Sequence, residues 1–500
     1  MSLAKRAVRS LNWQVLTLSF QAIATIIFLM IKSRIISKEA FGIFAIVNVL
    51  IALLQMFTEF GFGAALIQRK ENKPAHISFA FYSTLATGIF LYTIIVLAAP
   101  FIVSFYENKF ETSVVLAIGL NMIILSLGIV SKSLIMRDLE FKKLFFVVFV
   151  SNFIGNIFGI VLALCGFDIW ALISINLCMN ILSVIISFAL KPHSLKFIFD
   201  MTAAKEIFKF GAGLTLLRLF NQLSNQVDKL IIGKAMSTAV LGLYERSLYI
   251  AIMPRVYVGN TLDGVLFSTL SKVQSDSEKV QFIFFRLISL MVLFIGYISL
   301  TIFFFSKEVV MVILGEKWLE AVPILQILAF LIFFQIFSRF SDTLVRAKNA
   351  LYQSSVVKFI FLVVTVVGII IGLPYGIQAV SWMIVLAAII HSLLMLRLSM
   401  KVMEANWGAF LKILIPGLQL MAVLGVKNWL VIQFFSQYIP GALTILIVNF
   451  IIDLVIIFTI LKFKRTFFGR ENLRFLIRII ENVNYIKPHV KENITSYLKC

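Results

Sequence analysis

Long runs of apolar residues make up most of the chain, and short polar segments separate them. A helix needs about 20 mostly apolar residues to cross a bilayer, whereas a transmembrane strand would alternate over about ten residues. These runs are about twice that length and do not alternate, so they predict membrane-spanning helices. The fourteen predicted spans cover residues 12–33, 41–63, 78–105, 113–136, 145–165, 168–190, 210–234, 240–265, 283–305, 320–342, 353–373, 376–398, 411–432 and 440–462.

Composition supports the same fold class. Hydrophobic residues make up 61% of the 500 residues and charged residues only 14%, against about 25% charged in an ordinary soluble domain. A soluble fold of this length could not keep so much apolar surface away from water. The sequence therefore predicts an all-α membrane protein whose main solvent is lipid.

The formal net charge of +21 reflects where Lys and Arg lie between the spans. They concentrate in alternate gaps, such as residues 69–73, 137–143 and 191–209, and are sparse in the gaps between. Because cytoplasmic loops carry the excess of Lys and Arg, this pattern places both termini in the cytoplasm and requires an even number of spans. The positive surplus thus indicates topology and lipid-headgroup contact, and nothing indicates a nucleic-acid partner.

A weak internal repeat divides the chain. Residues 37–44 (SKEAFGIF) and 237–244 (STAVLGLY) align without a gap at an offset of 200. Similarly, Arg137 after span 4 corresponds to Arg346 after span 10. Duplicated helical units are frequent in transporters, although chance similarity between apolar segments remains the alternative. The predicted parts are an N-lobe (1–190, spans 1–6), a cytoplasmic amphipathic connector (191–209), a C-lobe (210–398, spans 7–12), two extra spans (399–462) and a basic amphipathic tail (463–500).

Span 7 carries polar side chains at helical spacing, namely Thr215, Arg218, Gln222, Asn225 and Lys229. A charged residue in the middle of a span costs about 3 kcal/mol on insertion scales unless it is hydrated or paired. The stripe therefore predicts the wall of an aqueous cavity. The alternative is that its amides join helices and Arg218 forms a structural ion pair.

Spans 1–2 and 7–8, which the repeat relates, carry much of the buried polarity. Arginine forms fork-like hydrogen bonds with phosphate oxygens, so a basic cavity would suit a pyrophosphate or acidic sugars. The candidate substrate-binding cations are Arg218, Lys229, Arg246, Arg255 and Arg339. The candidate polar lining is Gln14, Gln21, Asn48, Gln55, Gln222 and Asn225. The acids that either neutralise these cations or bind H⁺ or Na⁺ for coupling and gating are Glu59, Asp228, Asp263 and Asp342.

Other functions have less support from the residues. The four histidines are scattered, and no H-E-x-x-H motif or P-loop is present, so we expect no catalytic residues, metal or cofactor. This disfavours an integral-membrane glycosyltransferase or acyltransferase. A multidrug antiporter usually has twelve spans and an acidic cavity. The small residues Gly155 and Gly159 in span 5 indicate helix packing.

Several motifs together carry a family resemblance. They are FTEFGFGAALIQRK at 57–70, RDLEFKK at 137–143, IWAL at 169–172, VDKLIIGK at 227–234, LGLYERS at 241–247 and LGEKW at 314–318. With these motifs the chain resembles the polysaccharide transporter family. The resemblance is to its Wzx type, especially the colanic-acid exporter branch, within the multidrug/oligosaccharidyl-lipid/polysaccharide exporter superfamily.

The resemblance implies two six-helix lobes forming a V in the bacterial cytoplasmic membrane. It implies a flippase for an undecaprenyl-pyrophosphate-linked oligosaccharide that works by alternating access, with a lipid II flippase as the closest alternative by substrate. Membrane lipids, a polysaccharide polymerase and glycosyltransferases of the same pathway are the expected partners. The resemblance supplies no settled set of functional residues.

Overall fold

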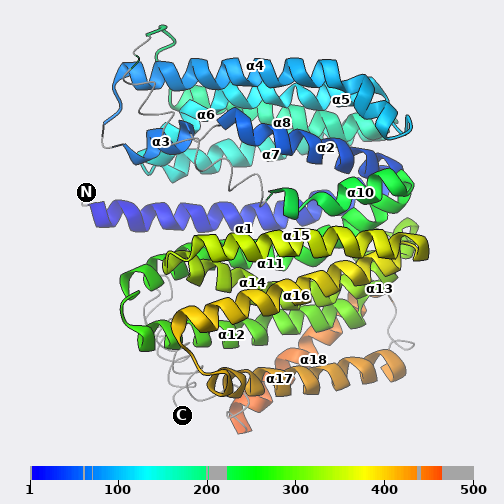
Figure 1. Ribbon diagram of the computed structural model, residues 1–500. Helices are drawn as coiled ribbons and strands as arrows, with labels where there is room; N and C mark the ends of the chain where they lie inside the picture. The colour runs from blue at the N-terminus through cyan, green and yellow to red at the C-terminus, as the bar shows by residue number, and fades with distance from the viewer. Residues whose placement is uncertain are drawn as a thin grey trace. The chain divides into compact units, whose positions relative to one another are not determined.

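The structure is a computed structural model that describes residues 3–59, 62–69, 71–198, 201, 222–435 and 441–463. None of these residues lies in a β-strand. The α-helices (Figure 1) are α1 (Leu3–Ile35), α2 (Lys38–Glu59), α3 (Phe62–Gln68), α4 (Pro74–Phe105), α5 (Thr112–Gly119), α6 (Asn121–Arg137), α7 (Phe141–Leu164), α8 (Asp168–Leu190), α10 (Val227–Ala235), α11 (Thr238–Lys272), α12 (Ser277–Phe304), α13 (Ser306–Ile313), α14 (Val322–Ala347), α15 (Leu351–Gly372), α16 (Ile377–Met403), α17 (Trp407–Leu430) and α18 (Ala442–Phe463).

Twelve candidate membrane spans lie within the described residues, so the all-α membrane class is confirmed. Each coincides with a predicted span. The predicted span 240–265 falls within the continuous helix α11, which is not among the twelve. The predicted span 210–234 begins outside the described residues. The total of fourteen therefore stays a prediction.

The chain divides into two compact units, Met1–Arg246 and Ser247–Cys500. In the first unit α7 packs on α8 and α1, α4 packs on α6, and α10 packs on α2. In the second unit α14 packs on α12 and α16, α15 packs on α16, and α17 packs on α12. The predicted lobe boundaries stay predictions, and residues 464–500 of the predicted tail lie outside the described residues.

The predicted connector is described only in part. Residues 192–198 are not helical, and the backbone N–H of Ile198 donates to Ser78 Oγ on α4 at 2.8 Å. The hydroxyl of Tyr82, also on α4, donates to the carbonyl of Leu195. This part of the connector therefore runs along α4 in an irregular conformation.

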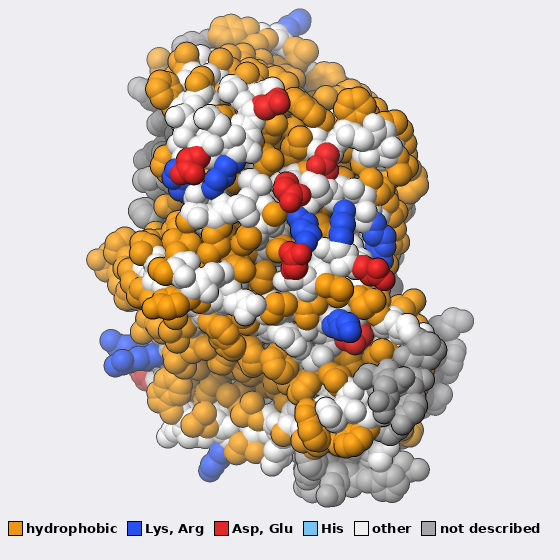
Figure 2. All heavy atoms as spheres, turned by 90° about the vertical axis from the view of Figure 1, so that its right-hand side faces the viewer, with side chains coloured by type: hydrophobic (Ala, Val, Ile, Leu, Met, Phe, Trp, Pro, Cys, Tyr) orange, Lys and Arg blue, Asp and Glu red, His pale blue; other side chains and the backbone are white. Residues whose placement is uncertain are grey.

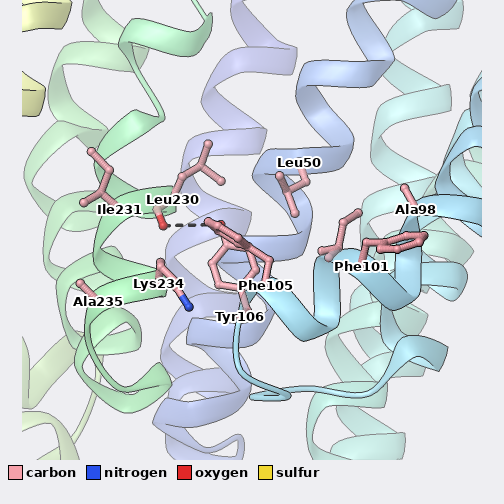
Figure 3. A pocket seen from close by; sticks show the side chains of 10 residues that line it. Leu50, Ala98, Phe101, Phe105, Tyr106, Leu230, Ile231, Lys234 and Ala235 are labelled. Atoms are coloured by element: carbon pink, nitrogen blue, oxygen red, sulfur yellow. Dashed lines mark hydrogen bonds between the residues drawn. The ribbon is translucent and has the colours of Figure 1, made fainter.

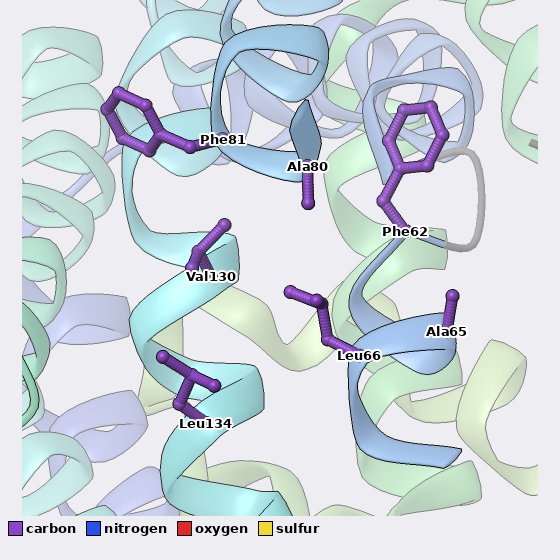
Figure 4. Packing of buried hydrophobic residues seen from close by; sticks show 7 residues of the cluster. All are labelled: Phe62, Ala65, Leu66, Ala80, Phe81, Val130 and Leu134. Atoms are coloured by element: carbon purple, nitrogen blue, oxygen red, sulfur yellow. The ribbon is translucent and has the colours of Figure 1, made fainter. Parts of the chain in front are cut away.

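Small and apolar side chains hold the first unit together. Seven buried residues of α3, α4 and α6 form one cluster, which Figure 4 shows: Phe62, Ala65, Leu66, Ala80, Phe81, Val130 and Leu134. On α7, a Cβ added to Gly159 would lie 1.9 Å from Ile175 Cγ1, and one added to Gly155 would lie 2.3 Å from Met179 Cγ. Because α8 approaches so closely, the interpretation of these glycines as packing residues is confirmed.

Both copies of the sequence repeat form the same turn. Ser37 Oγ accepts the backbone N–H of Ala40 at 3.0 Å at the start of α2. Ser237 Oγ accepts the backbone N–H of Val240 at 3.3 Å at the start of α11. A serine before the first turn satisfies a backbone donor that the helix itself cannot pair, so each serine positions the beginning of its helix.

Two glycines of the repeat face each other just after these caps. A Cβ on Gly42 would lie 1.8 Å from the backbone oxygen of Thr238, and one on Gly242 would lie 2.1 Å from the backbone oxygen of Lys38. All four residues belong to the unit Met1–Arg246. Each copy thus contacts the other through the same surface, as across a two-fold axis. We call this contact the glycine crossing.

Candidate functional site

Polar side chains of α10 and α11 form the first cation cluster: Lys229, Glu245 and Arg246. The Arg246 Nε donates to Glu245 Oε2 at 2.5 Å, and Lys229 Nζ lies 3.9 Å from Glu245 Oε1. These three side chains are only 10–16% exposed. The Arg246 guanidinium also lies 4.4 Å from the centre of the Phe41 ring on α2. One carboxylate therefore serves two cations, and an aromatic face orients one of them.

Asp228 lies next to this cluster in the sequence but has a different partner. The Tyr244 hydroxyl donates to Asp228 Oδ2 at 2.6 Å, and both residues are buried. Asp228 Oδ1 has no hydrogen-bond partner among the described residues. Sequence reasoning missed Tyr244 as a functional partner, although it occupies the last position of the repeated motif.

Arg255, Asp263 and Arg339 form the second cation cluster, between α11 and α14. Arg339 donates from Nε and Nη2 to Asp263 Oδ2 at 2.8 and 2.6 Å, and from Nη1 to the carbonyl of Arg255 at 3.3 Å. Gly259 makes room, because a Cβ there would lie 2.5 Å from Arg339 Cζ. The Nε of Arg255 is buried and has no hydrogen-bond partner among the described residues.

The first cluster belongs to the unit Met1–Arg246 and the second to the unit Ser247–Cys500, and both have the same balance of charges. Each contains two cationic side chains and one carboxylate: Glu245 pairs with both cations of the first cluster, and Asp263 pairs with Arg339 of the second. One carboxylate neutralises one unit of positive charge, so each trio by itself carries a formal net positive charge, and Asp228 also interacts electrostatically with Lys229. Buried cations are retained when they are paired or when they serve a ligand. An anionic group fits both clusters.

Asp342 belongs to another network in the second unit. It accepts from Ser354 Oγ at 2.7 Å and pairs with Lys358 at 2.8 Å and with Arg346 at 3.3 Å. Sequence reasoning missed Lys358, a single cation in an otherwise apolar span. Its spacing from Ser354, one helical turn, was the available signal. Coupling or gating by Asp342 stays a prediction.

The remaining candidates are dispersed. Asn48 and Asn225 are exposed, whereas Gln21, Gln55 and Gln222 are half-buried. Arg218 lies outside the described residues, as do the side chains of Gln14 and Glu59. Among the described residues, no group of His, Cys, Asp or Glu could hold a metal ion. The predicted roles of these residues stay untested.

An apolar groove of about 570 Å³ lies between α2, α4 and α10 (Figure 3). The lining includes Phe101, Phe105 and Tyr106, and Lys234 is the one charged residue among the described residues that line it. The Lys234 ammonium lies 5.1 Å from the centre of the Phe105 ring and 2.7 Å from Glu107 Oε1. The ammonium hydrogen bond lowers the pKa of Glu107.

Lys109 fixes the end of α10 beside this groove. Its ammonium donates to the carbonyls of Gly233, Lys234 and Met236 at 3.0, 2.8 and 2.8 Å. A cation at a helix C-terminus satisfies carbonyls that have no partner within the helix. On the face that Figure 2 presents, cations lie beside acids and form no patch of one sign.

A family comparison identifies the family of the chain. Residues 31–323 match the model of a family described as polysaccharide biosynthesis protein. The chain belongs to this family. The polysaccharide transporter resemblance carried by the motifs is thereby confirmed.

Relatives of this family member have names from polysaccharide pathways. The chain is 24% identical over 386 residues to the teichuronic acid biosynthesis protein TuaB of Bacillus subtilis (strain 168). This alignment covers 74% of the chain and 78% of TuaB. It is 24% identical to the lipopolysaccharide biosynthesis protein WzxC of Escherichia coli (strain K12), over 66% of this chain and 67% of WzxC. It is 23% identical to the succinoglycan biosynthesis transport protein ExoT of Rhizobium meliloti (strain 1021), over 65% and 66%.

Solved structures agree on the fold of this family member. The lipid II flippase MurJ in its inward closed conformation matches with a TM-score of 0.71 and 17% identity, over 94% of this chain and 100% of that chain. An inward-facing multidrug resistance MATE family transporter of the MOP superfamily matches with a TM-score of 0.62 and 14% identity, over 78% and 96%. At these identities the likeness establishes the fold alone.

Proposed function

We propose that this chain moves a polyprenyl-pyrophosphate-linked oligosaccharide across the bacterial cytoplasmic membrane. Its family and the names of TuaB, WzxC and ExoT support a role in polysaccharide export, and ExoT is named a transport protein. The substrate has two dissimilar parts, an anionic pyrophosphate sugar and a long apolar chain. A translocation pathway must therefore bind anions inside a membrane-embedded fold.

The cation surplus of the two clusters is the observation that carries this proposal. A pyrophosphate presents several anionic oxygens, and Arg donates to such oxygens in a fixed fork. In the second cluster, the buried Nε of Arg255 has no partner among the described residues. Because an unpaired buried donor is costly, a phosphate oxygen that accepts from it would gain affinity. In the first cluster, Phe41 holds the Arg246 guanidinium in place for the same role.

Alternating access supplies the movement. A ligand drives a conformational change only through different affinities for the two states. The glycine crossing supports a closed arrangement at the beginnings of α2 and α11, because the two helices are there in backbone contact. We propose that the repeats separate at this crossing to release the sugar headgroup. H⁺ or Na⁺ coupling and delivery to a polymerising enzyme are further parts of the proposal.

The test measures translocation of a fluorescent polyprenyl-pyrophosphate oligosaccharide in proteoliposomes. Arg255→Gln keeps most of the side-chain volume but removes the charge. We expect a loss of about 10- to 100-fold, since hydrogen bonds to charged groups contribute about 1.5–3 kcal/mol. Lys279→Gln is the matched control, because Lys279 forms an exposed ion pair with Asp276. Wild-type translocation with Arg246, Arg255 and Arg339 all changed to Gln would refute the cationic pathway.

The substrate class has its own test. The similar structures include a lipid II flippase and multidrug transporters, so fold does not choose the cargo. We expect the oligosaccharide lipid to compete with its own fluorescent form, whereas lipid II and a cationic dye do not compete. Competition by lipid II alone would assign the chain to peptidoglycan precursors.

A further inference from the structure

A buried ion network lies between α12, α17 and α18 and shares no residue with either cation cluster. Lys427 Nζ lies 2.6 Å from Asp453 Oδ1 and donates to Asn449 Oδ1 at 2.5 Å. Asn449 Nδ2 and the Tyr297 hydroxyl donate to Asp453 Oδ2 at 2.9 and 3.0 Å. Asn449 and Asp453 are each only 1% exposed. Sequence reasoning missed this network, although Asn449 and Asp453 follow each other by one helical turn in an apolar span.

The network lies deep in its span. Asp453 follows the beginning of α18 by eleven residues. At a rise of about 1.5 Å per residue, it is about 16 Å along the helix, near the middle of a hydrocarbon core about 30 Å thick. An ionisable residue at such a depth is costly, and it usually marks a pathway or relay for ions.

A need to hold α17 and α18 in place does not by itself account for this ion pair. Well-packed apolar residues often hold helices together as well as, or better than, a buried pair of charges. Moreover, α17 already packs on α12, and Ser289 Oγ of α12 donates to the carbonyl of Ile413 on α17 at 3.0 Å. The pair therefore offers something that apolar packing cannot, namely a charge that another cation can replace.

The Lys427 ammonium occupies a position suited to a small cation. It sits between two oxygen atoms, one from the Asp453 carboxylate and one from the Asn449 amide. Hard cations bind oxygen ligands of these types. Asn428, the next residue on α17, is fully buried, and neither its amide nitrogen nor its oxygen has a hydrogen-bond partner among the described residues. This part of α17 thus buries a further polar side chain without a partner among the described residues.

We propose that Asp453 is a cation-exchange site, where a sodium ion or a proton replaces the Lys427 ammonium. Asn449 and Tyr297 supply the neutral oxygen atoms around it. The helix α13 also packs on α18, and among the described residues no charged group of α13 contacts Asp453. This exchange would break the ion pair that joins α17 to α18. This inference concerns the appended helices and holds whichever substrate is carried.

The experiment uses the full chain in lipid nanodiscs. Its first arm measures binding of ²²Na⁺, and its second follows thermal unfolding against pH in sodium-free choline buffer. Lys427→Met should lower the Kd for sodium at least tenfold, because the competing ammonium is gone. Asp453→Asn should abolish saturable binding, and Tyr297→Phe, which loses only a hydroxyl, should weaken it several-fold. Glu71→Gln is the control, since Glu71 is an exposed carboxylate between α3 and α4.

The outcomes separate the two cations. Saturable sodium binding that Asp453→Asn removes identifies sodium. A pH dependence of unfolding that Asp453→Asn removes, without sodium binding, identifies the proton. A merely structural pair would leave Lys427→Met destabilised and unable to bind sodium. The inference is wrong if two results hold for wild type, Lys427→Met and Tyr297→Phe alike. None of them binds sodium saturably, and the pH dependence of unfolding of each equals that of Asp453→Asn.

Discussion

The glycine crossing allows a direct test of the proposed movement. Ala at position 42 would place a Cβ 1.8 Å from the backbone oxygen of Thr238, and Ala at position 242 would place one 2.1 Å from the oxygen of Lys38. Carbon–oxygen contacts between helices are ordinarily about 3.3 Å or longer. The helices must therefore separate by about 1.5 Å for Gly42→Ala and about 1.2 Å for Gly242→Ala, because a backbone oxygen cannot rotate away.

Such overpacking costs about 1–3 kcal/mol in the state where the helices touch. A state in which the crossing is open does not bear this cost. Either substitution should consequently shift the equilibrium about 5- to 150-fold toward the open state. Since both glycines act on one contact, the double variant should shift it by less than the sum of the single effects.

Disulfide formation between introduced cysteines measures this population. The native cysteines are first replaced by Ser, and Lys38→Cys is combined with Thr238→Cys. Gly42→Ala should reduce the cross-linked fraction and slow translocation. Gly425→Ala is the matched control, because its Cβ would meet only Phe304 Cε2, at an ordinary 3.9 Å. Unchanged cross-linking and translocation in both glycine variants would refute the reasoning.

Two further predictions concern stability. Tyr244→Phe removes the donor to the buried Asp228 and should destabilise the protein by about 1–3 kcal/mol, measured as a lower Tm. Tyr249→Phe should cost less, because Tyr249 is only half-buried. An equal effect of the two substitutions would contradict the assigned role of Tyr244. Lys234 lowers the pKa of Glu107 below its ordinary value. The Glu107 carboxylate therefore stabilises the fold at any pH above the ordinary pKa of a glutamate. This contribution is lost as the pH falls through the lowered pKa. The Tm difference between wild type and Glu107→Gln should accordingly be present at pH 7 and vanish in acid; a difference that grows in acid would reverse the sign of this argument.

The membrane class and the helices could be predicted from the sequence because both follow from local chemistry. An apolar run about 20 residues long must form a helix in lipid, since each backbone donor needs a partner within the segment. For the same reason the predicted spans coincide with helices such as α4, α14 and α16. The repeated segments 37–44 and 237–244 were visible in the sequence, and the structure adds that Ser37 and Ser237 cap both helices.

Pairing of charges could not be predicted in this way. Helical spacing shows which side chains share a face, but partners on different helices meet only through packing. The partners Asp263 and Arg339 are separated by 76 residues, and Tyr297 and Asp453 by 156. Sequence reasoning therefore named Asp263 and Arg339 without showing that they pair, and it did not find Lys427 with Asp453.

The order of polar and apolar residues by itself determined that this protein consists of apolar helices long enough to cross a membrane. Tertiary structure alone decided that Gly42 meets Gly242, that Asp263 pairs with Arg339, and that Lys427 pairs with Asp453. The physical reason is range. Hydrogen bonding and burial along one helix are set by neighbours within a few residues, whereas the charge around a side chain depends on which distant helices pack beside it.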